Sequence, residues 1–168
     1  MPDHGEVTVG AAMRTAFRGH GTSVAIATTS SDGRPAGVLV SSLVSVSVAP
    51  PVVMVSLSDA SFAAQEVLRG SRFAIHMLTG GDRELADWFA RPRPAAEEPP
   101  WTLDGSGVPL LDTLGPVLFG TVGDRVRAGS ATVVFVTVDH VEPARVHDPL
   151  ALVHVDRNWH LVPRDAGD

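Results

Sequence analysis

Residues 37–51 read Gly-Val-Leu-Val-Ser-Ser-Leu-Val-Ser-Val-Ser-Val-Ala-Pro-Pro, an aliphatic run that holds four serines and stops at a double proline. Proline breaks helices and central strands, so the β-branched residues before it predict a strand that ends there. A buried strand has little use for four hydroxyls, because an unpaired one costs roughly 1–3 kcal/mol. Two interpretations are open. One is a strand edge that holds a flat, polar or phosphorylated ligand, and the other is a β-bend whose hydroxyls bond to the backbone.

Apolar, β-branched segments separated by turn residues recur along the rest of the chain. Such segments predict strands, and short connections favour antiparallel pairing. The expected strands cover 22–29, 35–46, 52–57, 73–78, 117–126, 132–141, 150–155 and 158–162, with short extended pieces at 101–103 and 110–111. Asp32-Gly33 predicts a hairpin-type turn between the first two strands. Ser45 and Ser47 are two residues apart, which predicts that they share a face.

Three short helices are expected among these strands, over 11–18, 62–69 and 83–90. Ser58 and Ser61 are candidate N-caps for the second helix, and Asp82 is the candidate N-cap for the third. Many strands with few helices indicate a mainly β fold rather than a parallel α/β fold, whose crossovers need a helix after nearly every strand. We expect an antiparallel Greek-key barrel with two or three small peripheral helices.

The length of 168 residues and the apolar content of 44% fit one domain with a buried core. We expect a flexible leader over 1–10, a single domain over 11–163 and a short tail over 164–168. Residues 91–100 are rich in proline and predict a loop.

The composition argues against several classes of function. The chain has no Cys, which excludes disulfides, thiol nucleophiles and thiolate metal sites. All basic residues are Arg, and the net charge of −6 argues against a nucleic-acid surface. The longest apolar runs are too short to span a bilayer and no secretory signal is evident, so a cytoplasmic protein with no membrane contact is expected.

The histidines form no metal-ligand motif, and His76, on an expected strand, is interpreted as a satisfied core residue. The sequence has no nucleophile elbow and no glycine-rich phosphate loop, and nothing places a Ser-His-Asp triad. No side chain is therefore a certain catalytic residue, and we expect a cofactor to carry any chemistry.

The order of motifs resembles the flavin reductase-like family, FMN-binding split barrels that act as the reductase component of two-component flavin-dependent monooxygenases. The resemblance covers about residues 12–162. It is carried by Arg14, Ala25–Thr29, Asp32-Gly33, the Ser-Ser-x-x-Ser-Val-Ser-x-x-Pro-Pro string at 41–51, Leu85-Ala-Asp-Trp-Phe-Ala90 and Val155-Asp-Arg-Asn-Trp159.

The resemblance implies that the serine-rich strand holds FMN or FAD. The residues expected along the isoalloxazine, mainly through backbone amides, are Val38, Leu39, Val40, Ser41 and Ser42. Those expected at the ribityl chain and the phosphate are Ser45, Val46, Ser47, Ser58, Ser61 and Phe62. A helix N-terminus and hydroxyls can hold a phosphate without lysine.

Arg91 and Trp159 can each be interpreted in two ways. Arg91 is a candidate for charge compensation at the phosphate, and the alternative is a solvated arginine. Trp159 falls where the family carries an aromatic near the ring, and the alternative is a core residue that closes the barrel.

The resemblance also implies partners. NAD(P)H is the expected co-substrate, with Arg14, Arg157 and Trp159 as candidate nicotinamide contacts and no metal. A flavin-dependent monooxygenase is the expected protein partner. A homodimer is expected, because the flavin of this fold usually lies at a two-fold interface.

The chain departs from the family pattern at the site expected for the nicotinamide. The family's Gly-Asp-His, associated with nicotinamide docking and proton handling, is replaced by Gly129-Ser130-Ala131. Alanine can neither donate a hydrogen bond nor titrate. Leu39 and Leu43 replace the family's Thr and Phe. Flavin binding tolerates these changes more readily than hydride transfer does.

Three hypotheses follow. The first is an NAD(P)H:flavin reductase that supplies reduced flavin to a monooxygenase. The second is a flavin-binding split barrel that no longer uses nicotinamide, acting as a redox carrier or a biosynthetic enzyme. The third is an interaction module with an empty barrel, which leaves the serines unexplained.

Overall fold

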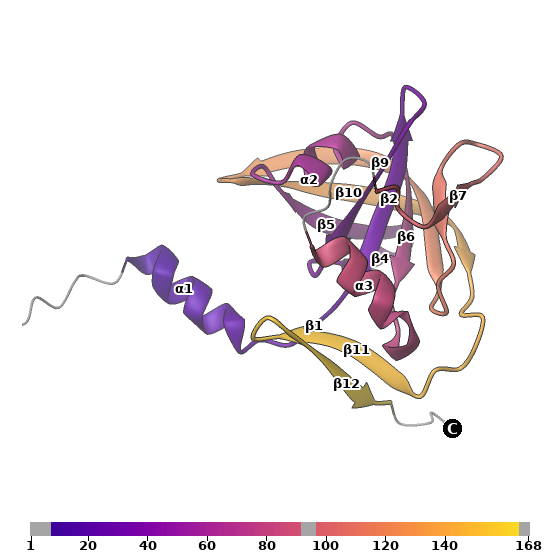
Figure 1. Ribbon diagram of the computed structural model, residues 1–168. Helices are drawn as coiled ribbons and strands as arrows, with labels where there is room; N and C mark the ends of the chain where they lie inside the picture. The colour runs from indigo at the N-terminus through magenta and orange to yellow at the C-terminus, as the bar shows by residue number, and fades with distance from the viewer. Residues whose placement is uncertain (1–7, 92–96, 165–168) are drawn as a thin grey trace, which may run out of the picture.

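A computed structural model describes residues 8–91 and 97–164 and shows a mostly antiparallel β fold, as expected (Figure 1). Seven strands form one sheet in the order β3-β2-β6-β9-β10-β5-β4, with every pair antiparallel. Their bounds are β2 Ala25–Ser31, β3 Arg34–Val40, β4 Val44–Val48, β5 Pro51–Ser58, β6 Arg72–Met77, β9 Val117–Ala128 and β10 Ala131–Glu142.

Two small sheets and the helices surround this barrel. One small sheet has the order β1-β11-β12 and the other pairs β7 with β8. The bounds are β1 Thr22–Ser23, β7 Trp101–Leu103, β8 Pro109–Leu111, β11 Leu150–Val155 and β12 Asn158–Pro163, with helices α1 Val9–Arg18, α2 Phe62–Val67 and α3 Arg83–Ala90 and the 3-10 helix η1 Gly80–Asp82. Each expected helix is present.

The expected turn between the first two long strands is confirmed. Asp32 has φ 51° and Gly33 has φ 72°. Positive φ at both central residues defines the type I′ turn, whose twist matches a two-residue hairpin. β2 and β3 accordingly pair from Ala25 with Val40 down to Ser31 with Arg34.

The continuous strand expected over 35–46 is wrong. β3 ends at Val40, residues 41–43 leave the sheet, and β4 begins at Val44. β3 and β4 therefore lie at opposite ends of the strand order. Because residues 41–43 lack the hydrogen bonds of a strand, their polar groups need other hydrogen-bond partners.

The expectation that Ser45 and Ser47 share a face is also wrong. Ser45 lies opposite Val53 of β5, whereas Ser47 lies opposite the neighbouring Val52. An extra residue on one strand forms a β-bulge, which shifts the alternation of side chains by one position. Because Val52 and Val53 point to opposite faces, so do the two serines that lie across from them.

The barrel closes without strand pairing between its two ends, and Ser42 bridges the gap. β3 contacts β5, but the two are not neighbours in the sheet. The Ser42 hydroxyl donates to the carbonyl oxygen of Ser56 at 3.0 Å and accepts from the Ser56 amide at 2.9 Å. For Ser42 the interpretation that its hydroxyl bonds to the backbone is therefore confirmed. The side chain makes the two hydrogen bonds to Ser56 that a paired strand would otherwise make.

Two apolar clusters flank β2, whose residues are buried on both faces. The first fills the barrel around Val55, Phe73 and Ile75, all fully buried. The second lies between β2 and α3 and contains Ile26 and Leu152. Burial of side chains this large stabilises the fold by about 1.5–3 kcal/mol each. The second cluster holds α3 against the sheet.

His76 is fully buried, but it is not the satisfied core residue that was expected. Its Nε2 lies 3.4 Å from the Thr28 hydroxyl, which has the carbonyl oxygens of Pro109 and Ala74 as acceptors at 2.6 and 3.2 Å. Its Nδ1 has no hydrogen-bond partner among the described residues. Burial lowers the pKa of His76 to about 4. The ring is therefore neutral at neutral pH.

Asp82 does not cap α3 through its side chain, contrary to expectation. Its carboxylate accepts from the amide and the hydroxyl of Thr79 at 2.8 and 2.9 Å, and from the Leu114 amide at 2.8 Å. The bond from the Thr79 amide is one half of a capping box at η1, in which the Asp82 amide in turn faces the Thr79 side chain. The buried carboxylate therefore stabilises η1, the 3-10 turn before α3, and not the first turn of α3 itself.

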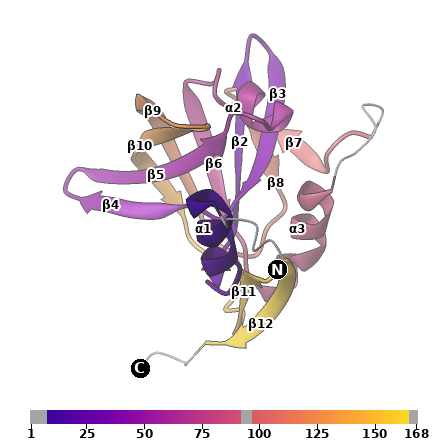
Figure 2. The same ribbon diagram turned by 90° about the vertical axis from the view of Figure 1, so that its left-hand side faces the viewer.

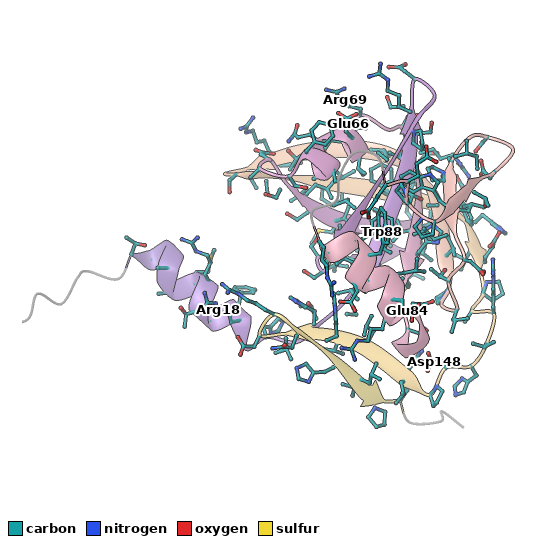
Figure 3. All side chains as sticks on the ribbon, viewed as in Figure 1. Arg18, Glu66, Arg69, Glu84, Trp88 and Asp148 are labelled. Carbon is teal, nitrogen blue, oxygen red and sulfur yellow. The ribbon has the colours of Figure 1, made fainter. Side chains whose placement is uncertain are left out.

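α1 stands away from the barrel in Figure 1, and in Figure 2, which is seen from that side, it lies in front of the barrel. It begins at Val9, two residues before the expected start, and none of its residues is buried. The part of the expected leader over 1–7 lies outside the described residues. Figure 3 labels Arg18 at the end of α1, where the Asp156 amide donates to its carbonyl at 2.8 Å. This bond ties the helix to the β11–β12 turn.

Candidate flavin site

β3 is the edge strand of the large sheet, so one row of its main-chain groups has no strand beside it. Helices α2 and α3 both contact β3. Figure 1 shows α2 near one end of β2 and β3 and α3 in front of them. Between these helices the edge of β3 borders a groove made of two overlapping cavities.

The first cavity has a volume of about 290 Å³ and lies beside α2. The residues that line it are Val38, Leu39, Val40, Ser41, Ser42, Ser56, Leu57, Ser58, Ser61, Ala64 and Ala131. The structure thus brings together the whole predicted 38–42 stretch with Ser58 and Ser61.

The second cavity has a volume of about 390 Å³ and extends the groove toward α3. It shares Val38, Leu39, Ser41 and Ser61 with the first cavity and ends at Trp159. Cavities of roughly 300–1,000 Å³ suit ligands of drug size, and the groove falls in that range.

The serine hydroxyls of the groove keep donor capacity. Ser61 accepts from the Ala64 amide at 3.2 Å, which confirms it as the N-cap of α2. Ser58 accepts from the Ala60 amide at 3.3 Å. Ser41 makes no hydrogen bond within the described residues. Each of these three hydroxyls can still donate its proton to an oxygen atom of a ligand.

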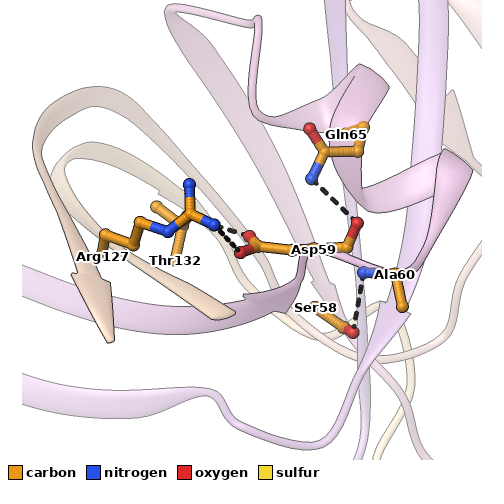
Figure 4. A network of polar contacts seen from close by, with 6 residues as sticks. All are labelled: Ser58, Asp59, Ala60, Gln65, Arg127 and Thr132. Carbon is orange, nitrogen blue, oxygen red and sulfur yellow. Dashed lines mark hydrogen bonds and ion pairs between the residues drawn. The ribbon is translucent and has the colours of Figure 1, made fainter. Parts of the chain in front are cut away.

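A polar network holds the turn that carries Ser58 and Ser61 (Figure 4). Asp59 forms an ion pair with Arg127 at 3.2 Å and accepts from the Thr132 hydroxyl at 3.3 Å. The Gln65 side chain donates to the Asp59 carbonyl at 3.3 Å. Because β9 and β10 supply Arg127 and Thr132, the turn is anchored to the barrel wall.

Trp159 and His154 form the far end of the groove. The Trp159 indole donates to the Asp87 carboxylate of α3 at 2.8 Å. The rings of His154 and Trp159 lie 4.8 Å apart between centroids and are tilted by 55°. The two residues face each other across the β11–β12 hairpin.

His154, Asp87 and Arg83 were not singled out from the sequence. The hairpin register that places His154 beside Trp159 is the signal that could have found His154. Asp87 and Arg83 lie on the expected helix over 83–90, but nothing in the local sequence indicates that this helix faces Trp159.

Of the predicted nicotinamide residues, Trp159 lines the groove, whereas Arg14 and Arg157 lie just outside it. Arg14 and Arg157 line a cavity of about 290 Å³ together with Ser41 and His154. Arg157, Arg91 and Trp159 line another cavity of about 460 Å³. Arg91 lies 3.7 Å from Asp87, at its Nη2 atom, and is mostly exposed.

Four predicted residues do not line these cavities. Ser45, Val46 and Ser47 lie on β4, at the opposite edge of the sheet. Phe62 points away from the barrel, with 82% of its surface exposed. Their contact with a cofactor stays a prediction, and within one chain the four cavities give it no support.

Ala131 lies in the wall of the first cavity. It is paired across the sheet with Ser58. The position that the resemblance assigns to a histidine therefore borders the groove, and its methyl group adds no donor and no charge there.

The groove fits a flat, phosphorylated group. Its two cavities are lined by three serine hydroxyls with donors to spare and by the free edge of β3, and no carboxylate lines either of them. Anionic oxygens accept hydrogen bonds from such donors, and apolar side chains suit the faces of a ring system. FMN, an isoalloxazine ring that carries a ribityl phosphate, has this chemistry.

Two other kinds of function find no support in residues 8–91 and 97–164. No group of three or more His, Asp or Glu side chains is placed to share a metal ion there. No helix in these ranges is long and apolar enough to cross a membrane.

Comparison with known structures confirms the expected split-barrel fold. A flavin reductase domain protein from Arthrobacter sp. FB24 superposes with a TM-score of 0.83 and 28% identity, over 93% of this chain and 98% of that one. The flavin reductase component of a bacterial two-component tryptophan halogenase shares the fold with a TM-score of 0.77 at 22% identity, over 92% of this chain and 99% of that one.

Curated relatives agree with this result. The chain is 29% identical over 160 residues to a probable flavin reductase of Rhizobium meliloti, covering 93% of this chain and 50% of that protein. It is also 29% identical to the FMN reductase (NADH) RutF 2 of Methylorubrum extorquens, covering 95% of this chain and 93% of that protein. The chain thus spans only half the length of the Rhizobium relative.

The family model described as "Flavin reductase like domain" matches residues 17–161, which include the barrel, the groove and Trp159. That match spans most of the chain, and the serine string that predicted it lines the groove in part. The chain belongs to the flavin reductase-like family.

Proposed function

We propose that the protein is an NADH-dependent flavin reductase that binds FMN in the groove along β3. The observation that carries this proposal is the lining of the first cavity, where Val38 to Ser42 meet Ser58, Ser61 and the start of α2. Several relatives are named FMN reductase (NADH) or NADH:FMN oxidoreductase, which supports FMN and NADH as the pair.

The residues of the chain bind and orient in this proposal. The edge of β3 offers main-chain donors and acceptors to the ring, and the Ser58 and Ser61 hydroxyls donate to the phosphate. Trp159, held by its 2.8 Å bond to Asp87, forms a fixed wall at the ring end. A flavin held by these residues would supply the redox chemistry, namely acceptance of a hydride from NADH and a proton from solvent, with NAD⁺ as the product.

A partner flavin-dependent monooxygenase and a cytoplasmic location belong to the same proposal. Structural neighbours with this fold include the styrene monooxygenase flavin reductase of Pseudomonas putida S12, at 22% identity and a TM-score of 0.77. A reductase whose groove is open to solvent can release reduced flavin to a second protein.

A homodimer is also proposed, and two apolar surfaces support it. On α1, Val9, Met13 and Phe17 are exposed by 87%, 57% and 66%. On β4, the valines at 44, 46 and 48 are exposed by 45%, 49% and 88%. Apolar surface of this extent on a protruding helix and an edge strand is typical of an interface between subunits.

The direct test is NADH oxidation with added FMN. We expect a rate well above that of NADH with free FMN alone, and saturation with FMN. FAD and NADPH run in parallel assign the preferred pair. A rate equal to that of free flavin would refute the reductase proposal.

A second candidate function rests on Ala131, which leaves the groove without the family's histidine. In this alternative the protein binds flavin but does not take hydride from nicotinamide. A bound yellow flavin that NADH fails to bleach would favour it. In that case we expect Ala131→His to raise the NADH-driven bleaching rate by about tenfold or more, the usual contribution of a positioned donor being 10²–10⁴. The FMN affinity of the variant, measured alongside, is the control for changes in flavin binding.

A further inference from the structure

The cavity of about 460 Å³ between α3 and the β11–β12 hairpin is unusually basic for this chain. Three arginines are among the residues that line it, Arg83, Arg91 and Arg157, against one acidic residue, Asp87. The whole protein carries a net charge of −6. A local excess of positive charge on an acidic protein draws anions to this position.

The arginines of this cavity are largely unneutralised. Asp87 is already bonded to the Trp159 indole at 2.8 Å, and its distance to Arg91 is a long 3.7 Å. Arg83 and Arg157 form no ion pair within the described residues. Guanidinium groups that face one cavity repel each other, so an anion bound between them would lower the electrostatic energy.

Arg157 is held in a conformation that arginine rarely adopts. It and Asp156 form the two-residue turn between β11 and β12, with φ 63° and φ 48°. Such turns favour Asn-Gly, because a residue other than glycine pays a strain cost at positive φ. The turn places Arg157 in the wall of the cavity between α3 and the hairpin.

The basic cavity is continuous with the flavin groove. Ala90, His154 and Trp159 line both. A ligand could therefore place a flat ring beside Trp159 and extend its phosphates toward the arginines. Arginine binds phosphate oxygens through two parallel hydrogen bonds, which suits a diphosphate.

We infer that this cavity is a subsite for the diphosphate of a dinucleotide, which enters the groove with its ring end first. Two dinucleotides share this chemistry: the nicotinamide co-substrate, and FAD if it replaces FMN as the flavin. The inference deepens the proposed function by naming the residues that hold the phosphates, and it can be tested without turnover.

The test measures equilibrium binding of FMN, FAD, ADP and NAD⁺ to the full chain by calorimetry. The variants are Arg83→Gln, Arg91→Gln, Arg157→Gln and the triple variant. Exposed charge pairs each contribute modestly, so we expect about a threefold rise in Kd per arginine and about thirtyfold for the triple variant. FMN, which lacks a diphosphate, should change by less than about twofold.

The ligand whose Kd rises in the arginine variants identifies the source of the diphosphate. A higher Kd for NAD⁺ and ADP assigns the subsite to the nicotinamide nucleotide, and a higher Kd for FAD alone assigns it to the flavin. Arg34→Gln, at the exposed first residue of β3, is the matched loss of charge and should leave all four affinities unchanged. The inference falls if the triple variant matches Arg34→Gln, or if FMN weakens as much as the dinucleotides.

Arg157→Gly separates binding from folding. Glycine relieves the positive φ, so the melting temperature should rise by roughly a few degrees while dinucleotide affinity falls. A structural role alone would instead leave affinity unchanged. If the protein does not oxidise NADH but the arginine variants still bind dinucleotides more weakly, the proposed reductase function is refuted and the subsite is supported. If the protein oxidises NADH but the arginine variants bind dinucleotides as tightly as wild type, the subsite is refuted and the reductase function is supported.

Discussion

The two halves of residues 37–51 share a composition and have separate positions in the fold. The first half, through Ser42, lies at the β3 edge against α2 and α3 and lines the groove. The second half forms β4 at the other edge, where Val48 is 88% exposed. The three residues that leave the sheet at 41–43 separate them. A single repeated pattern of Val and Ser therefore supplies two different surfaces.

The chemistry of the two surfaces differs because their neighbours differ. Along β3, two helices flank the strand edge and leave hydroxyls and main-chain groups facing the groove between them, which suits a polar ligand. Along β4, nothing within the described part of the chain covers the outer edge, and the exposed side chains are mainly valine. An uncovered apolar edge suits a second protein surface rather than a small anion.

Filling the groove should have the largest effect. We expect Ser41→Trp to raise the Kd for FMN about a thousandfold, or about 4 kcal/mol, because the indole occupies space in the three cavities that Ser41 lines. Ser45→Trp adds the same volume to β4, and if the groove of one chain alone holds the flavin, the Kd should change by less than about twofold. The measurement is fluorescence quenching of FMN.

Two results would contradict the assignment of the ligand to β3 and not to β4. Equal FMN affinity in wild type and Ser41→Trp would show that FMN does not bind in the β3 groove. Loss of binding in Ser45→Trp would show that β4 also reaches the flavin, which within the observed sheet order requires a second copy of the chain.

His76 offers a way to change stability without changing binding. Its pKa of about 4 in the folded state lies below the usual value of 6.5, because burial disfavours the charged ring. The unfolded chain therefore binds the proton first as the pH falls. The contribution is complete above pH 6.5 and is lost progressively toward pH 4, by on the order of 2–3 kcal/mol.

The check is urea unfolding from pH 4 to 7.5 in wild type and His76→Leu. The difference in unfolding free energy between the two should change with pH over this window and be flat above it, while FMN affinity at pH 7.5 stays within about twofold. A pH-independent difference would show that the ring titrates normally and is not buried as described.

The smallest expected effect concerns the hydroxyl that bridges the barrel. Ser42→Ala removes both bonds to Ser56 and leaves a backbone donor and acceptor of β5 without their partner. We expect a loss of about 1–2 kcal/mol in unfolding free energy. Ser45→Ala, on the exposed strand, is the matched control and should change stability by less than about 0.5 kcal/mol. Equal losses in the two variants would contradict the bridging role.

The repeating elements of this fold could be predicted from sequence because local signals determine them. The Asp32-Gly33 turn, the Ser61 cap and the spacing of the apolar strands each carry their own stereochemical reason. The break at 41–43 has no such local signal, since Ser-Ser-Leu is compatible with a strand. Its cause is tertiary, namely the bonds from Ser42 to Ser56 across the opening of the barrel.

The candidate site divides in the same way. Val38 to Ser42, Ser58 and Ser61 were predicted together because the motif and the helix cap are contiguous signals. Asp87 and His154 were missed because their role depends on which helix face meets which hairpin. The bulge that places Ser45 and Ser47 on opposite faces was missed as well, because the prediction assumed a regular alternation of side chains along the strand.

Hydrogen exchange with and without FMN reports on both halves of residues 37–51 in one experiment. If the edge of β3 holds the flavin, amide exchange in 38–42 slows on addition of FMN, by more than any change in 44–48. Unchanged exchange in 38–42, or protection confined to 44–48, would show that the edge of β3 does not hold the flavin.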